Sequence, residues 1–495
     1  MGTQHPDNAR APFWEQDGDG YVSTSEEVLE SAMSFIELGC EEYMWDWEGK
    51  HVDEGVVEKL LTEYHDFFSK HQLGKDRFLT FRIPNIWEEK GRSLARAFMN
   101  MLTAEEFAVD LGLNARPLFE IILPMADKAE KLIQMQRRFT ELARFKHKLF
   151  DDEKTDFDYL EIIPLIEGVR EMTGVRTLLD NYLVLHKKQY KRKPEYMRVF
   201  LARSDPALMS GLVPAVIANR VALSELYEWS KDNATPIFPW LGAGSLPFRG
   251  GLRPDRISTF AKTYPGIRSV SIQSSFRYDY PVETVKAGIS ELNVALSSTE
   301  PVLLSHSERA ASKRIIKACE APYQQTISSI ASTINAIAEH VPSRRDRRLH
   351  IGLLGYGRTL GKRTLPRAIA FTASLYSLGI PPELIGTGRG IAALSPKDLQ
   401  VLEKQYITLA DELMEAGQYL NTENLAFLAK KSRGFKQIQK DVQLLESYCG
   451  KKLEPKTSTS FIHRNWTSTL YFQLQAKESL TASINESAKI RNSLG

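Results

Sequence analysis

Residues 239–255, PWLGAGSLPFRGGLRPD, place several glycines and two arginines, Arg249 and Arg253, directly behind the apolar run 237–241. A buried strand that ends in such a loop brings backbone N–H groups and guanidinium groups to one place, where phosphate or carboxylate oxygens bind well. The stretch therefore predicts an anion-binding loop. Glycine-arginine loops are also often plain turns, so the rest of the chain has to decide between the two interpretations.

Two carboxylates stand at the ends of other apolar runs. Glu167 ends the run EIIPLIE, and Asp205 closes the run VFLARSD. With no cysteine or histidine pair beside them, they suit a hard cation such as Mg²⁺ or Mn²⁺, and we predict that both are metal ligands. The alternative for either residue is a carboxylate that caps the next helix or pairs with an arginine.

Arginines occupy the same kind of position, close to the ends of apolar runs. If these side chains met at one mouth, they would repel one another unless a multiply charged anion bound among them. The pattern predicts a metal-dependent enzyme that acts on a small phosphorylated and carboxylated molecule. One or two of these arginines could instead form structural ion pairs, and Arg203 and Arg253 are the weakest candidates for substrate binding. The predicted substrate-binding arginines are Arg82, Arg203, Arg249, Arg253 and Arg389.

The elements that must position these residues are short apolar runs with helical patterns between them. Such an alternation is typical of buried parallel strands in β-α units, and six units indicate a (β/α)8 barrel of the TIM type with many additional helices. Residues 349–354 and 384–385 would complete eight strands, and a doubly wound sheet is the alternative. The six runs are 78–83, 118–123, 160–166, 197–202, 237–241 and 268–272.

The chain divides into three parts on this reading. Residues 1–75 form an N-terminal segment and helices that pack on the barrel, and residues 76–395 form the barrel with a helical insertion at about 282–340. Residues 396–495 show apolar stripes at helical spacing and form a C-terminal helical region.

Composition sets the broad class. The 495 residues are 42% hydrophobic with a formal net charge of +2, which gives no reason to expect nucleic acid as a partner. No apolar run is long enough to span a membrane, and three distant cysteines favour a reducing compartment, so we expect a cytoplasmic protein. The basic cluster at residues 344–348 is interrupted by Asp346 and is read as a solvated loop or subunit contact.

Five motifs together resemble the short archaeal-type phosphoenolpyruvate carboxylases. They are TQHPDNA, EIIPLIE, FLARSDPALMSG, GSLPFRGGLRP and RAIAFTASLYSLGIPPELIGTGRG, and they are spread over most of the chain. The resemblance implies a β/α barrel enzyme that works as a homotetramer, needs Mg²⁺ or Mn²⁺ and uses no biotin. It also implies the reaction of phosphoenolpyruvate with bicarbonate to give oxaloacetate and phosphate.

The resemblance also assigns roles to residues. His5 looks like the catalytic histidine, Glu167 and Asp205 like the metal-binding pair, and Arg82 and Arg389 like arginines that hold the substrate or stabilise the intermediate. Arg249 looks like the loop arginine, so the implied catalytic set is His5, Arg249 and Arg389. Asn492 resembles an asparagine that helps bind an inhibitory dicarboxylate.

One departure from the longer enzymes of this kind concerns the loop. Those enzymes have a histidine at the start of the glycine-arginine loop, whereas this chain reads GAGSLPFRGG there, so that role cannot be transferred. Two other classes stay open at this point. One is another metal-dependent barrel enzyme that uses phosphoenolpyruvate, such as an aldolase or phosphotransferase, and the other is a helical interaction protein.

Overall fold

The strands form one barrel. The computed structural model of the chain describes residues 1–495 except 16, 89–90, 151–156, 347–357 and 362. Within these residues, eight parallel strands pair in sequence order, and a bridge between Gly2 and Ile272 brings the first strand beside the last. The predicted β/α barrel is confirmed. The strands are β1 (Gly2–Thr3), β2 (Glu42–Asp46), β3 (Phe78–Arg82), β4 (Glu120–Leu123), β5 (Glu161–Ile166), β6 (Met197–Ala202), β7 (Ile237–Gly242) and β8 (Ser269–Ser271).

The first two strands come from the part of the chain where we predicted only helices. β2 pairs with β3 over its whole length, from Glu42 beside Phe78 to Asp46 beside Arg82. The barrel therefore begins at residue 2 rather than at residue 76.

The two strands that we predicted late in the chain do not fill these places. Residues 349–354 lie outside the described residues. Residues 384–385 are not a strand, because Pro382–Leu384 forms a short 3-10 helix, η3. Pro381 and Pro382 explain the difference, since proline cannot donate to a strand ladder and suits the first turn of a helix.

Helices surround the barrel and extend from it. Those up to residue 278 are η1 (Thr24–Glu26), α1 (Glu27–Ile36), α2 (Val56–Glu63), α3 (His65–Phe68), α4 (Arg92–Asp110), α5 (Ala129–Phe150), α6 (Val169–Thr173), α7 (Val175–Tyr190), α8 (Ser204–Ser210), α9 (Leu212–Asn233), η2 (Pro247–Arg249), α10 (Ile257–Thr263) and α11 (Ser274–Tyr278). The elements after β8 and α11 are α12 (Val282–Ser298), α13 (His306–Ala338), the hairpin β9 (Thr359–Leu360) and β10 (Arg363–Thr364), α14 (Ala368–Ser377), η3, α15 (Thr387–Ala392), α16 (Pro396–Gln405), α17 (Leu409–Gly417), α18 (Thr422–Lys431), α19 (Arg433–Cys449), α20 (Ser458–Ala476) and α21 (Thr481–Arg491).

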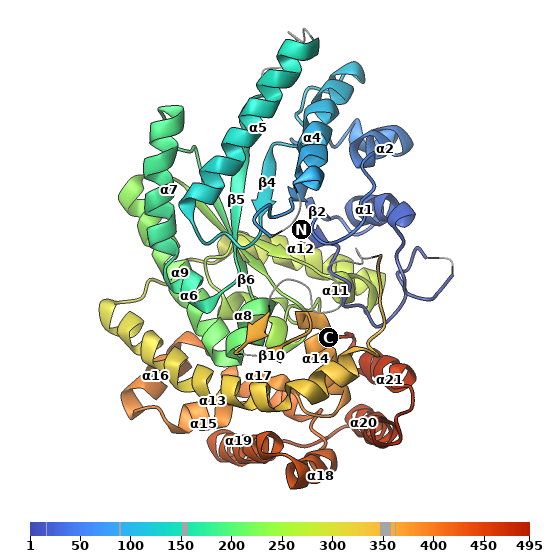
Figure 1. Cartoon of the computed structure of the whole chain (residues 1–495), viewed down its shortest axis with the longest axis vertical. Coiled ribbons are helices and arrows are strands. Elements are labelled where there is room, and N and C mark those ends of the chain that lie inside the picture. The colour runs from blue at the N-terminus through green and yellow to red at the C-terminus, as the bar shows by residue number, and fades with distance from the viewer. Residues whose placement is uncertain (16, 89–90, 151–156, 347–357, 362) are drawn as a thin grey trace.

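The C-terminal helices gather at one end of the molecule. Figure 1 shows the orange and red helices at the bottom of the view, while the long helix α5 projects at the top. Among the described helices, none alone has the length and apolar character to cross a membrane. By length and composition only, one pair of helical segments could do so when the two are taken together. The pair is Ala368–Ser377 with Pro382–Ala392, and it is bent by 94°.

The strands are apolar because both of their faces are covered. All five residues of β2 are buried, and β6 and β7 pair through six consecutive residues. Phe200 on β6 and Trp240 on β7 are partners in this register, and their rings stack with centroids 4.0 Å apart. Polar residues that must reach solvent or a ligand are therefore confined to the strand ends and the loops that follow them.

Candidate active site

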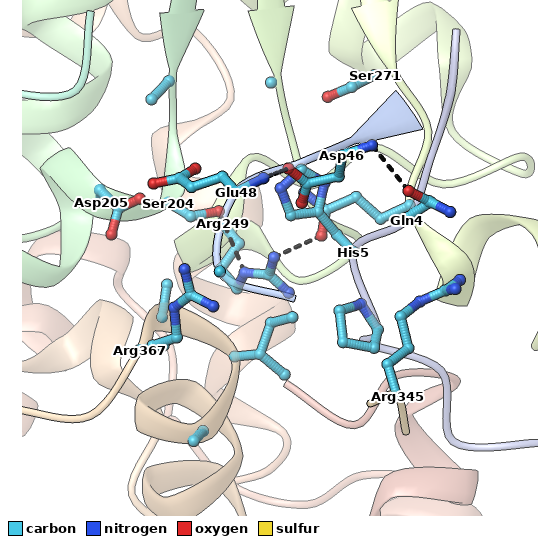
Figure 2. Close-up of a pocket in the computed structure, with 18 of the residues that line it drawn as sticks. Gln4, His5, Asp46, Glu48, Ser204, Asp205, Arg249, Ser271, Arg345 and Arg367 are labelled. Atoms are coloured by element: carbon cyan, nitrogen blue, oxygen red, sulfur yellow. Dashed lines mark hydrogen bonds between the residues drawn. The ribbon is translucent and has the colours of Figure 1, made fainter. Parts of the chain in front are cut away.

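A cavity of about 380 Å³ lies at the carboxyl ends of the barrel strands, against the start of α14. Figure 2 shows His5 beside Asp46 near its centre, with Asp205 and Arg367 together on the left of the view. The polar residues that line it and are discussed below are His5, Asp46, Glu48, Arg82, Glu167, Ser204, Asp205, Arg249, Gln273, Arg358 and Arg367. Strand ends, the N-terminal segment and the C-terminal cap thus contribute to one site.

The two predicted metal ligands both face this cavity. Burial, and then the charges of Asp205 and Glu48, raise the pKa of Glu167 to about 7. Burial acts in the same direction on Asp205, but the charge of Arg358, whose Nε donates to Asp205 Oδ1, holds the pKa of Asp205 below its ordinary value. The two carboxylates are therefore close enough to repel each other, and the positive charge of Arg358 offsets part of their negative charge.

The backbone helps to place Glu167. The Met125 N–H donates a hydrogen bond to Glu167 Oε2 at 2.8 Å, and Met125 has a φ of 51°, in the left-handed region that side chains other than glycine rarely adopt. Strained residues of this kind cluster at functional sites, where the surrounding structure holds them. Among the described residues, no group of three or more His, Cys, Asp or Glu side chains is arranged to hold a metal ion.

Arg82 lines the cavity as predicted, but its guanidinium group already has partners. Its Nε and Nη2 donate to the two oxygens of Asp46 at 2.8 and 2.5 Å, and Nε lies 3.3 Å from Glu48 Oε2. Asp46 ends β2 and Glu48 follows it, and neither was predicted as a site residue. The signal was present, because the apolar residues YMW before Asp46 are followed by carboxylates in the same way as the other strands.

Arg249 also lines the cavity and is almost completely buried. Its guanidinium donates to Ser204 Oγ at 3.1 Å, to Asp7 Oδ2 at 3.1 Å, to Gln273 Oε1 at 2.5 Å and to the carbonyl of Gly495. Ser204 directly precedes Asp205, so this arginine stands next to the carboxylate pair. The predicted anion-binding loop thus reaches the site through Arg249.

Arg367 is a cation that was not predicted from the sequence. It is the residue before α14, it lines the cavity, and its guanidinium group makes no ion pair or hydrogen bond within the described part of the chain. Its charge lowers the pKa of His5 and of Asp205, which places it close to both. The motif RAIAFTAS contained this signal, since it sets an arginine directly before an apolar helix.

His5 reaches the cavity because the N-terminal segment is part of the barrel. Thr3 Oγ1 lies 3.3 Å from the Ile272 carbonyl, to which it donates, and it lies 3.0 Å from His5 Nδ1. The Thr3 hydroxyl hydrogen is used in the first bond, so Nδ1 carries the ring hydrogen and donates it to Thr3 Oγ1. The lone pair of Nε2 is then available as a base.

The surroundings keep His5 neutral. Burial first, and then the charges of Arg82, Arg249 and Arg367, lower the pKa of His5 to about 3, while Asp46 acts in the opposite direction. An anion that binds among these arginines offsets their effect and raises the pKa. His5 therefore becomes a stronger base when a negatively charged substrate is present.

Of the five predicted arginines, Arg203 lines the cavity together with Arg82 and Arg249, whereas Arg253 and Arg389 do not. Arg203 is completely buried, and it donates to Tyr264 and to the carbonyls of Pro247 and Phe248, so it supports the loop rather than a ligand. The prediction that all five arginines meet at one mouth is therefore wrong.

Arg253 and Arg389 lie elsewhere. Arg253 pairs with Glu415 and Asp255 at a separate surface hollow. Arg389 is engaged by Asp441, which accepts from its Nε and Nη2 at 2.9 and 2.8 Å, and it does not line the cavity. The assignment of Arg389 as catalytic and substrate-binding is corrected, because its charge is compensated between α15 and α19.

Asn492 has a local role in the structure. It ends α21 with a φ of 52°, and its Oδ1 accepts a hydrogen bond from Arg10 at 2.7 Å. It does not line the cavity, whereas Leu494 does. The C-terminal segment thus reaches the site through a different residue from the one predicted.

Comparisons with known proteins cover the whole chain. A profile of the family described as "Phosphoenolpyruvate carboxylase" matches residues 1–495. A phosphoenolpyruvate carboxylase of Leuconostoc mesenteroides is 40% identical over 496 residues, covering 100% of this chain and 98% of that protein. One of Metallosphaera sedula is 36% identical over 525 residues, covering 100% and 99%. Among solved structures, a malate synthase of Haloferax volcanii matches with a TM-score of 0.34 and 11% identity. The match covers 64% of this chain and 92% of that one, and the similarity is low.

Proposed function

This chain belongs to the phosphoenolpyruvate carboxylase family, and we propose that it forms oxaloacetate and phosphate from phosphoenolpyruvate and bicarbonate without biotin. The observation that carries the proposal is the cavity of about 380 Å³, where the carboxylates Glu167 and Asp205, the neutral base His5 and the cations Arg249 and Arg367 face one another. This volume suits a small ligand, and the cations suit one with several negative charges.

In this proposal, arginines from three different parts of the chain hold the substrate. Arg367 makes no ion pair within the described residues, so we assign it to the phosphate or carboxylate of phosphoenolpyruvate. We assign Arg249 to the phosphoryl end of the same ligand, and its hydrogen bond to Ser204, the residue before Asp205, supports this. Arg82 completes the positive wall, although Asp46 takes two of its donors.

Mg²⁺ or Mn²⁺ is the proposed cofactor, held by Glu167 and Asp205. Mg²⁺ commonly binds through one or two carboxylates together with substrate phosphate and water, and this donor set fits that pattern. The raised pKa of Glu167 supports the fit, since the repulsion between the carboxylates is what a divalent cation would relieve. When bound, the ion supplies Lewis-acid stabilisation of the phosphoryl and enolate oxygens.

In the first step, a bicarbonate oxygen attacks the phosphorus atom and the bond from phosphorus to the enol oxygen breaks. The products are carboxyphosphate and the enolate of pyruvate. Arg249 and Arg367 stabilise the negative charge that spreads over the phosphoryl oxygens and the enolate oxygen, and the surrounding structure holds both before the reaction starts.

In the second step, His5 Nε2 takes the proton from the carboxyl group of carboxyphosphate. The bond from carbon to the bridging oxygen then breaks, which gives CO₂ and phosphate, and the enolate carbon attacks CO₂ to form oxaloacetate. The negative charge of the intermediates raises the pKa of His5 when this proton has to be accepted. Exclusion of water matters, because a protonated enolate leaves as pyruvate.

We also propose that the protein works in the cytoplasm as a homotetramer, as the family resemblance implies. The near-neutral composition supports no role for nucleic acid or a membrane. Light scattering coupled to size-exclusion chromatography tests the assembly, and a monomer that is fully active would contradict it.

The deciding experiment couples oxaloacetate formation to malate dehydrogenase and follows NADH oxidation. We expect a rate that requires phosphoenolpyruvate, bicarbonate and Mg²⁺ or Mn²⁺ together. Phosphate release without oxaloacetate at saturating bicarbonate would instead indicate another enzyme that uses phosphoenolpyruvate, such as an aldolase or phosphotransferase. If the protein shows neither activity nor metal binding, the remaining interpretation is a helical interaction protein.

A further inference from the structure

Glu383 is a completely buried carboxylate between α14 and α15, outside the cavity. It belongs to η3, and within the described residues it has no ion-pair partner. One oxygen, Oε1, accepts two hydrogen bonds, from the Phe248 N–H at 2.8 Å and from the Tyr376 hydroxyl at 2.6 Å. The other, Oε2, has no hydrogen-bond partner among the described residues.

Phe248 directly precedes Arg249, and its peptide groups are held from two sides. Its N–H donates to Glu383, while its carbonyl accepts from Arg203 Nη1 at 3.0 Å. A buried carboxyl group and a buried cation therefore fix the same residue through its backbone. Hydrogen bonds that involve a charged group are stronger than those between neutral groups, and Arg203 supplies one of them, so this residue is held firmly.

Glycines make this tight path possible. Gly250 and Gly251 have φ values of 127° and 71°, and a Cβ on Gly250 would lie 2.6 Å from the Cβ of Ala243. The turn that follows Arg249 can close only with these residues. The loop is thus shaped by its glycines on one side of Arg249 and by Glu383 on the other.

The second donor connects Glu383 to a different part of the site. Tyr376 lies in the last turn of α14, and Arg367 is the residue just before that helix. α14 is one short helix that is buried along nearly its whole length, so a displacement of Tyr376 at its end is carried to its first turn. One carboxylate oxygen therefore joins the loop of Arg249 to the helix that Arg367 precedes.

From this geometry we propose that Glu383 is a positioning residue for the reaction, which sets the separation between Arg249 and Arg367 on either side of the substrate. The inference rests on the proposed function for the identity of the ligand, phosphoenolpyruvate. Glu383 does not touch the ligand, and it acts through the Phe248 peptide and the Tyr376 hydroxyl.

Its energetic context agrees with a positioning role. Burial raises the pKa of Glu383 to about 7, while the bonds from Tyr376 and Phe248 act in the opposite direction and the charge of Glu412 adds to the rise. A buried carboxylate without an ion pair is a costly way to fill space, and an apolar residue would pack there without that cost. An apolar residue, however, could not accept the two hydrogen bonds that Oε1 accepts.

The test compares three variants of the full-length protein with the parent. Glu383→Leu keeps the volume but removes the acceptor, Glu383→Gln keeps an acceptor oxygen without the charge, and Tyr376→Phe removes one donor. Binding of phosphoenolpyruvate without bicarbonate is measured by calorimetry, and kcat/KM for phosphoenolpyruvate is measured in the coupled assay. Binding alone needs no turnover, so a failure of the proposed reaction is seen separately from a failure of this inference.

For Glu383→Leu we expect phosphoenolpyruvate affinity and kcat/KM to fall about 10–100-fold, the size of effect that a misplaced binding group produces. Glu383→Gln should restore both to within about threefold of the parent, and Tyr376→Phe should give an intermediate loss. In the double variant, Tyr376→Phe should add nothing to Glu383→Leu, because both act through the same oxygen.

Glu412→Leu is the matched control. Glu412 is also buried and accepts from a tyrosine hydroxyl, that of Tyr406, but it makes no hydrogen bond to the loop. It should lower the unfolding temperature without changing phosphoenolpyruvate affinity. If folded Glu383→Leu binds phosphoenolpyruvate as the parent does, the inference is wrong. If Glu383→Leu does not fold, Tyr376→Phe decides, and unchanged affinity in that variant overturns the inference.

Discussion

Asp7 and Arg249 lie 242 residues apart in the sequence, yet the Asp7 carboxylate accepts a hydrogen bond from the Arg249 guanidinium at 3.1 Å beside the cavity. Both side chains are almost fully buried. Burial raises the pKa of Asp7, and the charge of Arg249 opposes that rise. This ion pair ties the segment that carries His5 to the loop that carries Arg249.

Breaking this pair should destabilise the protein, and bound phosphoenolpyruvate should recover part of the lost stability. Asp7→Asn keeps an acceptor for the Ser275 N–H but leaves Arg249 buried without its counter-charge, which typically costs about 3–5 kcal/mol. Phosphoenolpyruvate supplies negative charge, so it should stabilise the variant more than the parent in urea unfolding. Asp17→Asn, at an exposed residue of the same segment, is the control. An equal response of parent and Asp7→Asn to phosphoenolpyruvate would contradict the expectation.

Metal binding should depend on both carboxylates of the pair. Glu167→Gln and Asp205→Asn each replace an anionic oxygen ligand by a neutral one at nearly constant volume, and each should weaken Mn²⁺ binding at least about tenfold in calorimetry. Glu161→Gln is a matched control, because Glu161 stands at the opposite end of the same strand, β5. Parent-like Mn²⁺ affinity in both site variants would show that the ligands lie elsewhere.

Removal of His5 should separate the two steps of the reaction. His5→Asn leaves Glu167, Asp205 and the arginines in place, so phosphoryl transfer should continue. Loss of a general base costs about 10²–10⁴-fold in the step that it serves, and the stranded enolate should leave as pyruvate together with phosphate. The ratio of pyruvate to oxaloacetate is the measurement. Unchanged oxaloacetate yield and rate would show that His5 has no part in the chemistry.

Arg367 and Arg389 should respond differently to the same substitution. Arg367→Gln removes a charged contact to the substrate, worth about 1.5–3 kcal/mol, and should raise KM for phosphoenolpyruvate about 10–100-fold. Arg389→Gln removes the partner of Asp441 between α15 and α19, so it should lower stability and leave KM unchanged. The reverse pattern would restore the sequence-based assignment of Arg389.

The depressed pKa of His5 predicts a pH effect on stability. The folded-state pKa is about 3, below the ordinary value of 6.5, so the unfolded chain takes up a proton between these values and the folded chain does not. Stability should therefore fall as pH drops through 6.5. His5→Asn should lose roughly 1–2 kcal/mol less than the parent between pH 7 and pH 5 in urea unfolding. A substitution at the exposed His306 should leave the parent's pH dependence unchanged.

The sequence predicted the parts of the fold that carry strong local signals. Six strands were found because their residues are buried on both faces and form continuous apolar runs. β1 was missed because two residues leave no periodic pattern, and β2 because the run EYMWD follows a helix closely and reads as an interruption of it. Short strands of this kind are defined by their neighbours in space rather than by their own residues.

The misassignment of Arg389 has a specific cause. The glycines of GTGRG read as a loop, but Gly388 and Gly390 lie within α15, where they allow close packing against other helices. A Cβ on Gly388 would lie 2.3 Å from the Asp441 carbonyl oxygen, and one on Gly390 would lie 2.6 Å from the sulfur of Cys319. The sequence cannot distinguish glycine that shapes a loop from glycine that lets two helices touch. Glu167 and Asp205 were predicted from their positions after apolar runs and His5 from the motif TQHPDNA, and all three line the cavity.

The bridge between Gly2 and Ile272 has a consequence for the order in which the protein matures. β1 can join β2 early, but its second neighbour lies about 270 residues further along the chain, and such distant contacts form late. In a folding intermediate in which β1 has not yet paired with Ile272, β5 and β6 would be paired and would hold Glu167 and Asp205 together. His5 would not yet lie at the cavity. Closure of the barrel is therefore also the step that brings His5 to the cavity lined by Glu167 and Asp205.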